Sequence, residues 1–281
     1  MSTVEDRIPV PANPLSAPRP NPTRVGAAAW SRVSAVGLPA VSTLIAIALW
    51  WSATIVFEIR TFFLPAPPDI IESFLKMPDY LLEQAWVTLG ETLMGFALAA
   101  VGGLLIAVVL SASQLVQRAT MPLLVAVNSI PKLALAPLLL LWLGFGQLNR
   151  VVMVVLISFF PIVVSSMAGL GSTPADLNEL ARSLSASKWQ HFVKVRFPWA
   201  VPHIFVGLKV AISLALVGAV VAEFTGGGKG LGYVIVASGT SADTPLAFAA
   251  IVLLAVMSIG LFYLVVAAER RLLPWAKETT G

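Results

Sequence analysis

Six long apolar runs constrain what this sequence can fold into more than any other feature. A hydrocarbon core about 30 Å thick is crossed by roughly 20 residues of α-helix. Backbone groups cannot stay unsatisfied in lipid, and the runs lack the alternation of barrel strands, so we expect helices. The runs therefore predict an all-α integral membrane protein with six transmembrane helices, at 36–57, 86–112, 121–144, 149–170, 200–222 and 246–268.

The composition excludes an ordinary soluble domain. Of the 281 residues, 58% are hydrophobic and 11% are charged, against roughly 45–50% and about 25% in soluble proteins. A net charge of +4 without a folded basic surface gives no reason to expect nucleic acid as a partner. There is no cysteine, and His191 and His203 match no metal-ligand spacing, so we expect no cofactor and no metal.

The two ends of the chain are predicted to be tails. Residues 1–35 carry most of the seven prolines between Pro9 and Pro39 and have little apolar periodicity, which is typical of a disordered segment. The first apolar run begins late and is long enough to span, unlike a cleaved signal peptide. We therefore expect a disordered cytoplasmic tail at 1–35, a retained first transmembrane helix at 36–57 and a second cytoplasmic tail at 269–281.

The distribution of lysine and arginine predicts the orientation, because these residues concentrate in cytoplasmic loops. With a cytoplasmic N-terminus, the outer segments hold only Arg60, Lys76, Arg150 and Lys229. The inner segments then hold Arg7, Arg19, Arg24, Arg32, Arg118, Arg182, Lys188, Lys194, Arg196, Arg270, Arg271 and Lys277. Both termini are therefore expected in the cytoplasm, with the chain passing several times through the membrane.

The longest predicted cytoplasmic connection, 171–199, has the pattern of two short helices. Thr173 before Pro174 is typical of a helix start, and Ser187 with Gln190 has the spacing of a capping box. We expect a turn near Ser185. The first helix has one apolar face, formed by Leu177, Leu180, Ala181 and Leu184. This pattern fits either a helix lying on the membrane surface or a surface that docks a cytoplasmic partner.

The same loop resembles the EAA loop of importer permeases of the ATP-binding-cassette (ABC) class. The matching stretches are Glu179-Leu-Ala181, Ser183-Leu-Ser185-Ala-Ser187 and Phe197-Pro-Trp-Ala-Val-Pro202. Leu180 stands where the family usually has alanine, and Ser185 where it has glycine, a change that costs about 1 kcal/mol in a left-handed turn. The resemblance implies that residues 173–197 couple to a separate ATPase through Glu179, Leu180, Ala181, Leu184, Ser185, Ala186, Ser187 and Trp189.

Further motifs extend the resemblance over 84–268. They are Ser129-Ile-Pro131-Lys132 with Leu141-Trp-Leu-Gly144, Phe160-Pro161, and Glu223-Phe with Gly230-Leu-Gly232-Tyr233. Their order is similar to that of the nitrate/sulfonate/taurine-type branch of the binding-protein-dependent transport inner-membrane component family. The resemblance implies a permease domain at 84–268 with a type I ABC importer-like fold and no catalytic residues. It also implies an extracytoplasmic substrate-binding protein, cytoplasmic ABC ATPase subunits and a homodimer surrounded by the lipid of a bacterial inner membrane.

Polar residues at membrane depth are candidates for the translocation pathway, because such residues are costly in lipid and face protein or water. The two prolines around Lys132, Pro131 and Pro137, predict irregular backbone lining a cavity. Lys132 then either attracts an anionic cargo or pairs with a carboxylate elsewhere. Glu91 stands where related permeases often carry arginine, and Lys209 is expected to reach the cytoplasmic edge. The predicted pathway residues are Asn128, Ser129, Lys132 and Glu223.

These features together predict a permease subunit that imports a small anionic or polar organic solute, such as a sulfonate, taurine or nitrate. The glycine-rich stretch 226–232 is not a nucleotide-binding loop, because Gly230 follows Lys229 where such a loop requires serine or threonine. The alternative is a secondary transporter or channel that needs no ATPase. That alternative predicts an inverted repeat with broken helices in both halves, and the six runs show neither.

Overall fold

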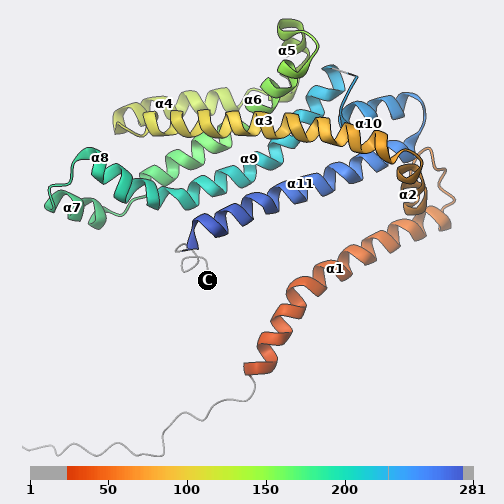
Figure 1. Cartoon of the computed structure of the whole chain (residues 1–281), viewed down its shortest axis with the longest axis horizontal. Coiled ribbons are helices and arrows are strands. Elements are labelled where there is room, and N and C mark those ends of the chain that lie inside the picture. Colours follow the sequence, from red (N-terminus) through yellow and green to blue (C-terminus); the bar gives the residue numbers. More distant parts are fainter. Residues whose placement is uncertain (1–23, 227, 275–281) are drawn as a thin grey trace, which may run out of the picture. The chain divides into compact units, whose positions relative to one another are not determined.

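The computed structural model describes residues 24–226 and 228–274, with side chains from residue 37 onward except at residues 39 and 114. Over these residues the chain is helical and has no strand (Figure 1). The helices are α1 (Arg24–Val56), α2 (Pro67–Lys76), α3 (Pro78–Leu110), α4 (Gln114–Asn128), the 3-10 turn η1 (Lys132–Leu135), α5 (Ala136–Leu143), α6 (Gln147–Gly171), α7 (Ala175–Ser183), α8 (Lys188–His191), the π-turn η2 (Phe192–Arg196), α9 (Phe197–Gly226), α10 (Leu231–Thr240) and α11 (Thr244–Leu272).

The chain divides into two units, Met1–Phe57 and Glu58–Gly281. In the first unit, α1 begins at Arg24, so the prediction of a disordered tail up to residue 35 is wrong for residues 24–35. The rest of that predicted tail, 1–23, lies outside the described residues, as do residues 275–281 of the predicted C-terminal tail. The apolar part of α1 with described side chains is Ala40–Val56.

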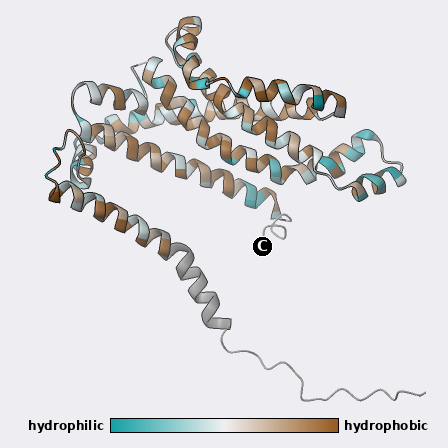
Figure 2. Ribbon diagram, turned by 180° about the vertical axis from the view of Figure 1, so that it is seen from behind, coloured by the Kyte–Doolittle hydropathy of each residue, from teal (hydrophilic) through white to brown (hydrophobic). Residues whose placement is uncertain are grey.

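The second unit is built around α6 and α9, which pack along each other, with α3 against both and α11 against α9. Figure 1 shows these four long helices side by side, and Figure 2 shows hydrophobic residues along most of their length. Small residues let the helices approach closely. A Cβ on Gly95 of α3 would lie 2.5 Å from Val154 of α6, and one on Gly207 of α9 would lie 2.7 Å from Ser165 Cβ.

The predicted count of six membrane-crossing helices is not confirmed within the residues that the structure describes. Among the described residues, four helices are long and apolar enough to cross, at Pro78–Leu110, Gln147–Gly171, Lys188–Gly226 and Thr244–Leu272. They contain most of the predicted spans 86–112, 149–170, 200–222 and 246–268. A fifth crossing requires a bent pair of helices to act as one span, and the short apolar part of α1 falls below the length needed.

The predicted continuous span 121–144 is broken in the structure. Leu115–Asn128 and Lys132–Leu143 meet at an angle of 68°. Pro131 lacks a backbone N–H and disfavours helical geometry at Ile130 before it, which gives a physical reason for the break. A second break follows α5, where Gly144 adopts a left-handed φ of 73°. The chain thus leaves irregular backbone on both sides of a short apolar helix.

The helix α2 lies outside the candidate spans and pairs charges along its surface. Pro67 begins the helix, and the Asp69 carboxylate accepts a hydrogen bond from the backbone N–H of Ala66. Lys76 Nζ lies 2.9 Å from the Glu72 carboxylate one turn earlier. The hydrogen bond to Glu72 and its negative charge raise the pKa of Lys76 above its ordinary value. Both side chains are exposed, so this pair adds little stability.

Candidate functional site

The predicted cytoplasmic loop folds as two short helices joined by a sharp turn. The turn is closed by hydrogen bonds from the Ser185 N–H to the Arg182 carbonyl (2.9 Å) and from the Ala186 N–H to the Ala181 carbonyl (3.0 Å). This pair of bonds is a Schellman motif, which requires a left-handed residue after the helix. Ser185 supplies it with φ 52°, so the turn predicted near Ser185 is confirmed with serine in the position usually taken by glycine.

The second helix starts as predicted and the first does not. The Ser187 N–H donates to Gln190 Oε1 (3.0 Å), and the Gln190 N–H donates to Ser187 Oγ (3.2 Å), which is the expected capping box. By contrast, Thr173 does not cap α7. The cap residue is Pro174, whose extended backbone leads directly into the helix at Ala175, without a side-chain cap.

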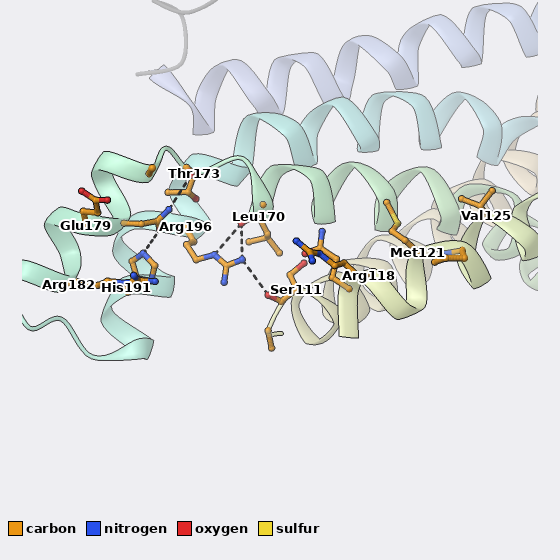
Figure 3. A pocket seen from close by; sticks show the side chains of 16 residues that line it. Ser111, Arg118, Met121, Val125, Leu170, Thr173, Glu179, Arg182, His191 and Arg196 are labelled. Carbon is orange, nitrogen blue, oxygen red and sulfur yellow. Dashed lines mark hydrogen bonds between the residues drawn. The ribbon is translucent and has the colours of Figure 1, made fainter. Parts of the chain in front are cut away.

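Three side chains that the sequence analysis did not single out hold this loop in place. Arg196 donates to the carbonyls of Leu170 (2.9 and 3.2 Å) and Ser111 (3.4 Å), at the C-terminal ends of α6 and α3 (Figure 3). A cation is favourable there because helix C-termini carry partial negative charge. Asn178 contacts His191 Nε2 at 2.8 Å and so joins α7 to α8. The loop is thereby fixed both internally and to the long helices.

The predicted coupling residues divide by exposure. Leu180, Leu184 and Trp189 are 56%, 73% and 72% exposed, although all three are large and apolar. Ala181, in contrast, is buried at 7% and packs inward. Of the smaller polar residues and alanine in the set, Ala186 is half-buried, while Glu179, Ser185 and Ser187 are exposed. Much of the ribbon of α7, α8 and their connection is coloured hydrophilic in Figure 2, so these apolar residues are exposed on a mainly polar loop.

The predicted pathway residues Asn128, Ser129 and Lys132 lie at the break between α4 and α5. Lys132 Nζ donates to Asn128 Oδ1 and lies 5.5 Å from the centre of the Phe160 ring of α6. Ser129 donates to the Val125 carbonyl one turn earlier (2.9 Å). Among the described residues, Lys132 has no carboxylate partner within ion-pair distance. The break therefore presents a half-buried cation backed by an amide and an aromatic face.

Glu223, the fourth predicted pathway residue, lies in a different environment. It is 1% exposed, and its carboxylate accepts hydrogen bonds from Thr88 Oγ1 (2.7 Å) and from the Gly232 N–H (2.7 Å). The Leu231 N–H donates to Thr88 Oγ1 (2.9 Å), and the Gly230 N–H donates to Gln84 Oε1 (2.7 Å). Glu223 and its neighbours thus satisfy the N-terminal N–H groups of α10, where a negative charge is favourable.

Two further charged residues form ion pairs between helices, and one of them was placed wrongly by the sequence analysis. Arg150, which was counted in an outer loop, is buried in α6 and lies 2.8 Å from Glu91 of α3. This pair explains the acidic residue at position 91, because it neutralises a buried arginine on the neighbouring helix. Lys209 pairs with Glu269, which lies near the C-terminal end of α11, at 2.9 Å. That Lys209 reaches the cytoplasmic edge stays a prediction.

Two residues that the sequence analysis missed, Gln84 and Thr88, share a detectable signal with Glu91, which it named without a partner. Gln84, Thr88 and Glu91 recur at spacings of four and three on a largely apolar helix, so they share one face. All three are buried. A polar stripe of this kind inside an apolar run indicates contact with polar groups on other helices. The partners themselves, Arg150 and Glu223, lie more than 50 residues further along the sequence, so the stripe alone does not identify them.

The family model described as "Binding-protein-dependent transport system inner membrane component" matches residues 99–274, more than half of the chain. The match includes α4, α7, α8 and the candidate residues from Asn128 to Glu223. It begins within α3, after the polar stripe, and ends near the end of the described residues. It therefore covers both the loop and the broken helix.

Named relatives agree with this family. The formylaminopyrimidine transport permease protein ThiX of Halalkalibacterium halodurans is 36% identical over 220 residues, covering 78% of this chain and 88% of that protein. The putative aliphatic sulfonates transport permease protein SsuC of Bacillus subtilis is 31% identical over 246 residues, covering 87% and 88%. Relatives named as taurine and nitrate permeases match as well.

The fold also matches a solved structure. A chain of the MetNI methionine ABC transporter in inward facing conformations superposes with a TM-score of 0.60 at 20% identity, covering 71% of this chain and 97% of that chain. At that identity the likeness concerns the fold alone. Taken with the family match, it leads to one conclusion: the chain belongs to the binding-protein-dependent transport system inner membrane component family, in its nitrate, sulfonate and taurine branch, and is an ABC importer permease rather than an enzyme.

Proposed function

We propose that residues 173–197 couple this permease to a separate cytoplasmic ATPase. The single observation that carries the proposal is the exposure of Leu180, Leu184 and Trp189 on a loop that is itself held rigidly. Large apolar side chains on short exposed helices are typical of helix-in-groove recognition. In this proposal Glu179, Ser185 and Ser187 contribute polar contacts at the rim, while buried Ala181 and half-buried Ala186 keep the turn in shape.

A force on α7 and α8 would pass into the membrane through defined contacts. Arg196 joins the loop to the ends of α3 and α6, and the π-turn Phe192–Arg196 continues directly into α9. These three long helices pack on one another over much of their length. Movement of the loop on ATP binding would therefore move the α3–α6–α9 group as a unit, which is the motion that alternating access requires.

The test is co-purification of the tagged full-length chain with the ATPase encoded beside it. We expect wild type to retain the ATPase and Trp189→Ala to lose at least about tenfold of it, since central anchors of an interface contribute about 2 kcal/mol or more. Glu179→Arg, which reverses a charge at the rim, should reduce retention by less than Trp189→Ala does. Glu83→Arg is the matched control, because Glu83 is an exposed glutamate at the opposite end of the bundle. Retention by every variant, or loss in the control, would contradict the proposal.

We further propose that Asn128, Ser129 and Lys132 line the pathway and that the cargo is a small anionic or polar organic solute. The half-buried Lys132 cation without a carboxylate partner among the described residues supports this. Relatives named for sulfonates, taurine and nitrate are consistent with an anion, while the relative named for formylaminopyrimidine is consistent with a polar heterocycle. In this proposal Glu223 stabilises the pathway indirectly, because it caps the N-terminus of α10.

Uptake into proteoliposomes that contain the permease and its ATPase tests the cargo proposal. Sulfonate, taurine, nitrate and an aminopyrimidine are offered separately, with and without ATP and the binding protein. We expect ATP-dependent uptake of one class, and a loss of about tenfold in Lys132→Gln that Lys132→Arg restores if the cargo is anionic. Uptake that persists without ATP would instead favour the secondary transporter or channel.

The remaining assembly is proposed from the family. We propose a homodimer, because one chain supplies only one side of an alternating-access pathway, with two ATPase subunits and an extracytoplasmic substrate-binding protein. The permease domain is assigned to 84–268, and both termini to the cytoplasm. Crosslinking of two differently tagged copies in membranes tests the homodimer, and exclusive pairing with a different permease chain would contradict it.

A further inference from the structure

A cavity of about 1160 Å³ opens at the end of the bundle that carries α7 and α8 (Figure 3). Its walls are α4, the C-terminal ends of α3 and α6, the loop helices α7 and α8, and the π-turn. Sites for small molecules are typically about 300–1,000 Å³. This cavity therefore has room for a ligand larger than a compact inorganic ion.

Cationic side chains dominate the polar part of the cavity. The lining includes the guanidinium groups of Arg118, Arg182 and Arg196, against one carboxylate from Glu179. Arg196 is committed to the carbonyls of Leu170 and Ser111. The guanidinium groups of Arg118 and Arg182, however, are exposed and make no hydrogen bond or ion pair with any residue the structure describes. Two guanidinium groups thus remain to bind an anion, and guanidinium matches phosphate geometry well.

Another part of the lining of the same cavity is apolar. Met121, Pro122 and Val125 from α4 and Leu170 from α6 form it. These residues fall inside apolar runs of membrane-spanning character, whereas Arg182 and Arg196 fall in the polar connection between two such runs. The cavity therefore crosses from hydrocarbon depth to the aqueous side. A ligand that fills it needs a charged head and an apolar tail.

We propose that this cavity binds an anionic phospholipid, with its anionic headgroup among the cationic side chains Arg118, Arg182 and Arg196 and an acyl chain along Met121 and Val125 (Figure 3). Basic pockets between transmembrane helices on the cytoplasmic side are suited to such headgroups. Arg182 lies in the last turn of α7, so a bound lipid would fix that helix against the end of α4. This inference goes beyond the proposed coupling and transport, because lipid binding requires neither cargo nor ATPase.

The test measures lipid binding to the purified full-length chain in detergent by native mass spectrometry. Dioleoyl phosphatidylglycerol, dioleoyl phosphatidylcholine and inorganic phosphate are titrated in separate arms. We expect wild type to bind phosphatidylglycerol more tightly than either of the other two. In Arg118→Gln/Arg182→Gln the affinity for phosphatidylglycerol should fall about 30-fold, since each basic residue near an anionic lipid contributes about tenfold or slightly less.

The matched control is Arg270→Gln/Arg271→Gln, which removes two exposed arginines near the end of α11 that do not line the cavity. We expect this control to bind as wild type does. An equal loss in the control, equal affinity for the two phospholipids, or phosphate binding as tight as phosphatidylglycerol binding would each overturn the proposal. The last outcome would indicate a site for a soluble anion.

A second variant tests the apolar part of the lining and does not depend on the arginines. Val125 is 57% exposed, so Val125→Gln leaves the buried core intact. We expect it to weaken phosphatidylglycerol binding by about threefold to tenfold, because part of the apolar contact area is lost, and to leave phosphate binding unchanged. Unchanged phosphatidylglycerol binding in this variant would contradict the placement of the acyl chain.

Discussion

At the residue scale, the buried charges of this permease act mainly on its structure. The Glu91–Arg150 pair lies between α3 and α6, and each side chain is less than 10% exposed. Desolvating two charges costs several kcal/mol each, and their attraction offsets this only while both are present. The pair therefore favours the one packing of α3 against α6 that brings the two charges together. It adds little to the free energy of unfolding.

This balance predicts that replacing one member of the pair destabilises the protein more than replacing both. Glu91→Leu alone should destabilise the protein by about 3–5 kcal/mol, because it leaves Arg150 buried without a counter-charge, whereas Glu91→Leu/Arg150→Met should cost much less. Thermal denaturation of the purified protein in detergent, read as retained monodisperse protein, measures this. Losses that simply add in the double variant would show that the two side chains do not interact.

A different residue-scale prediction concerns the glycines before α10. Gly230 has φ 99°, and a Cβ there would lie 2.1 Å from the Glu223 carboxyl carbon. Gly228 also has a left-handed φ, 67°, but a Cβ there would meet open space. Gly228→Ala should therefore cost only about 1–2 kcal/mol for the backbone. Gly230→Ala should cost clearly more, because it also displaces the cap on α10.

The comparison of these two alanine variants uses the same thermal assay, with hydrogen exchange of the first amides of α10 as the local readout. We expect faster exchange in Gly230→Ala than in Gly228→Ala. Equal exchange in the two would mean that Glu223 can move aside without loss of the cap.

At the element scale, the turn between α7 and α8 depends on one strained residue. Ser185 adopts φ 52° in a Schellman motif, a conformation that costs a residue with a Cβ about 1 kcal/mol relative to glycine. The turn persists because Ala186 and Ser185 both bond back to α7 and because the capping box starts α8 at once. Local bonds on both sides thus hold a conformation that serine alone disfavours.

The prediction at this scale is that Ser185→Gly strengthens the turn and Ser185→Val weakens it. The glycine variant should slow exchange of the Ala186 amide by about fivefold, the equivalent of about 1 kcal/mol. The valine variant should speed it, since β-branched residues tolerate positive φ poorly. Hydrogen exchange read by mass spectrometry on peptides across 180–190 measures both. No change in either variant would mean that opening of the loop is not limited by this turn.

At the scale of the whole molecule, the distribution of charge predicts which side of the membrane each end of the bundle faces. The end of the bundle that carries α7 and α8 holds many of the basic residues, including Arg182, Lys188 and Lys194. The opposite end carries α2 and the α10–α11 connection. Because basic residues are retained on the cytoplasmic side, the α7–α8 end should be inside and the α10–α11 connection outside.

The absence of native cysteine makes this orientation directly testable. Ser241→Cys lies between α10 and α11, and Ser183→Cys lies at the end of α7. Both positions are exposed. In intact cells a membrane-impermeant maleimide should label Ser241→Cys and not Ser183→Cys, and permeabilised cells should label both. The reverse pattern would invert the topology and remove the cytoplasmic ATPase from reach of the loop.

The sequence by itself determined the features that depend on local pattern. Apolar runs specified the long helices, because length and hydrophobicity are read directly against the membrane thickness. The capping box at Ser187 and the turn at Ser185 followed from residues within a few positions of each other. The order of the motifs around Glu179, Lys132 and Glu223 indicated the family without any tertiary contact.

Only the tertiary structure decided features that depend on residues distant in sequence. The partner of Glu91 is Arg150, and the bonds that bury Glu223 come from Thr88 and the start of α10. The prolines in the predicted span 121–144 indicated irregular backbone there. The 68° bend and the packing of α5, however, depend on neighbouring helices. A hydropathy pattern records how apolar each segment is, and it carries no information on which buried charges neutralise one another.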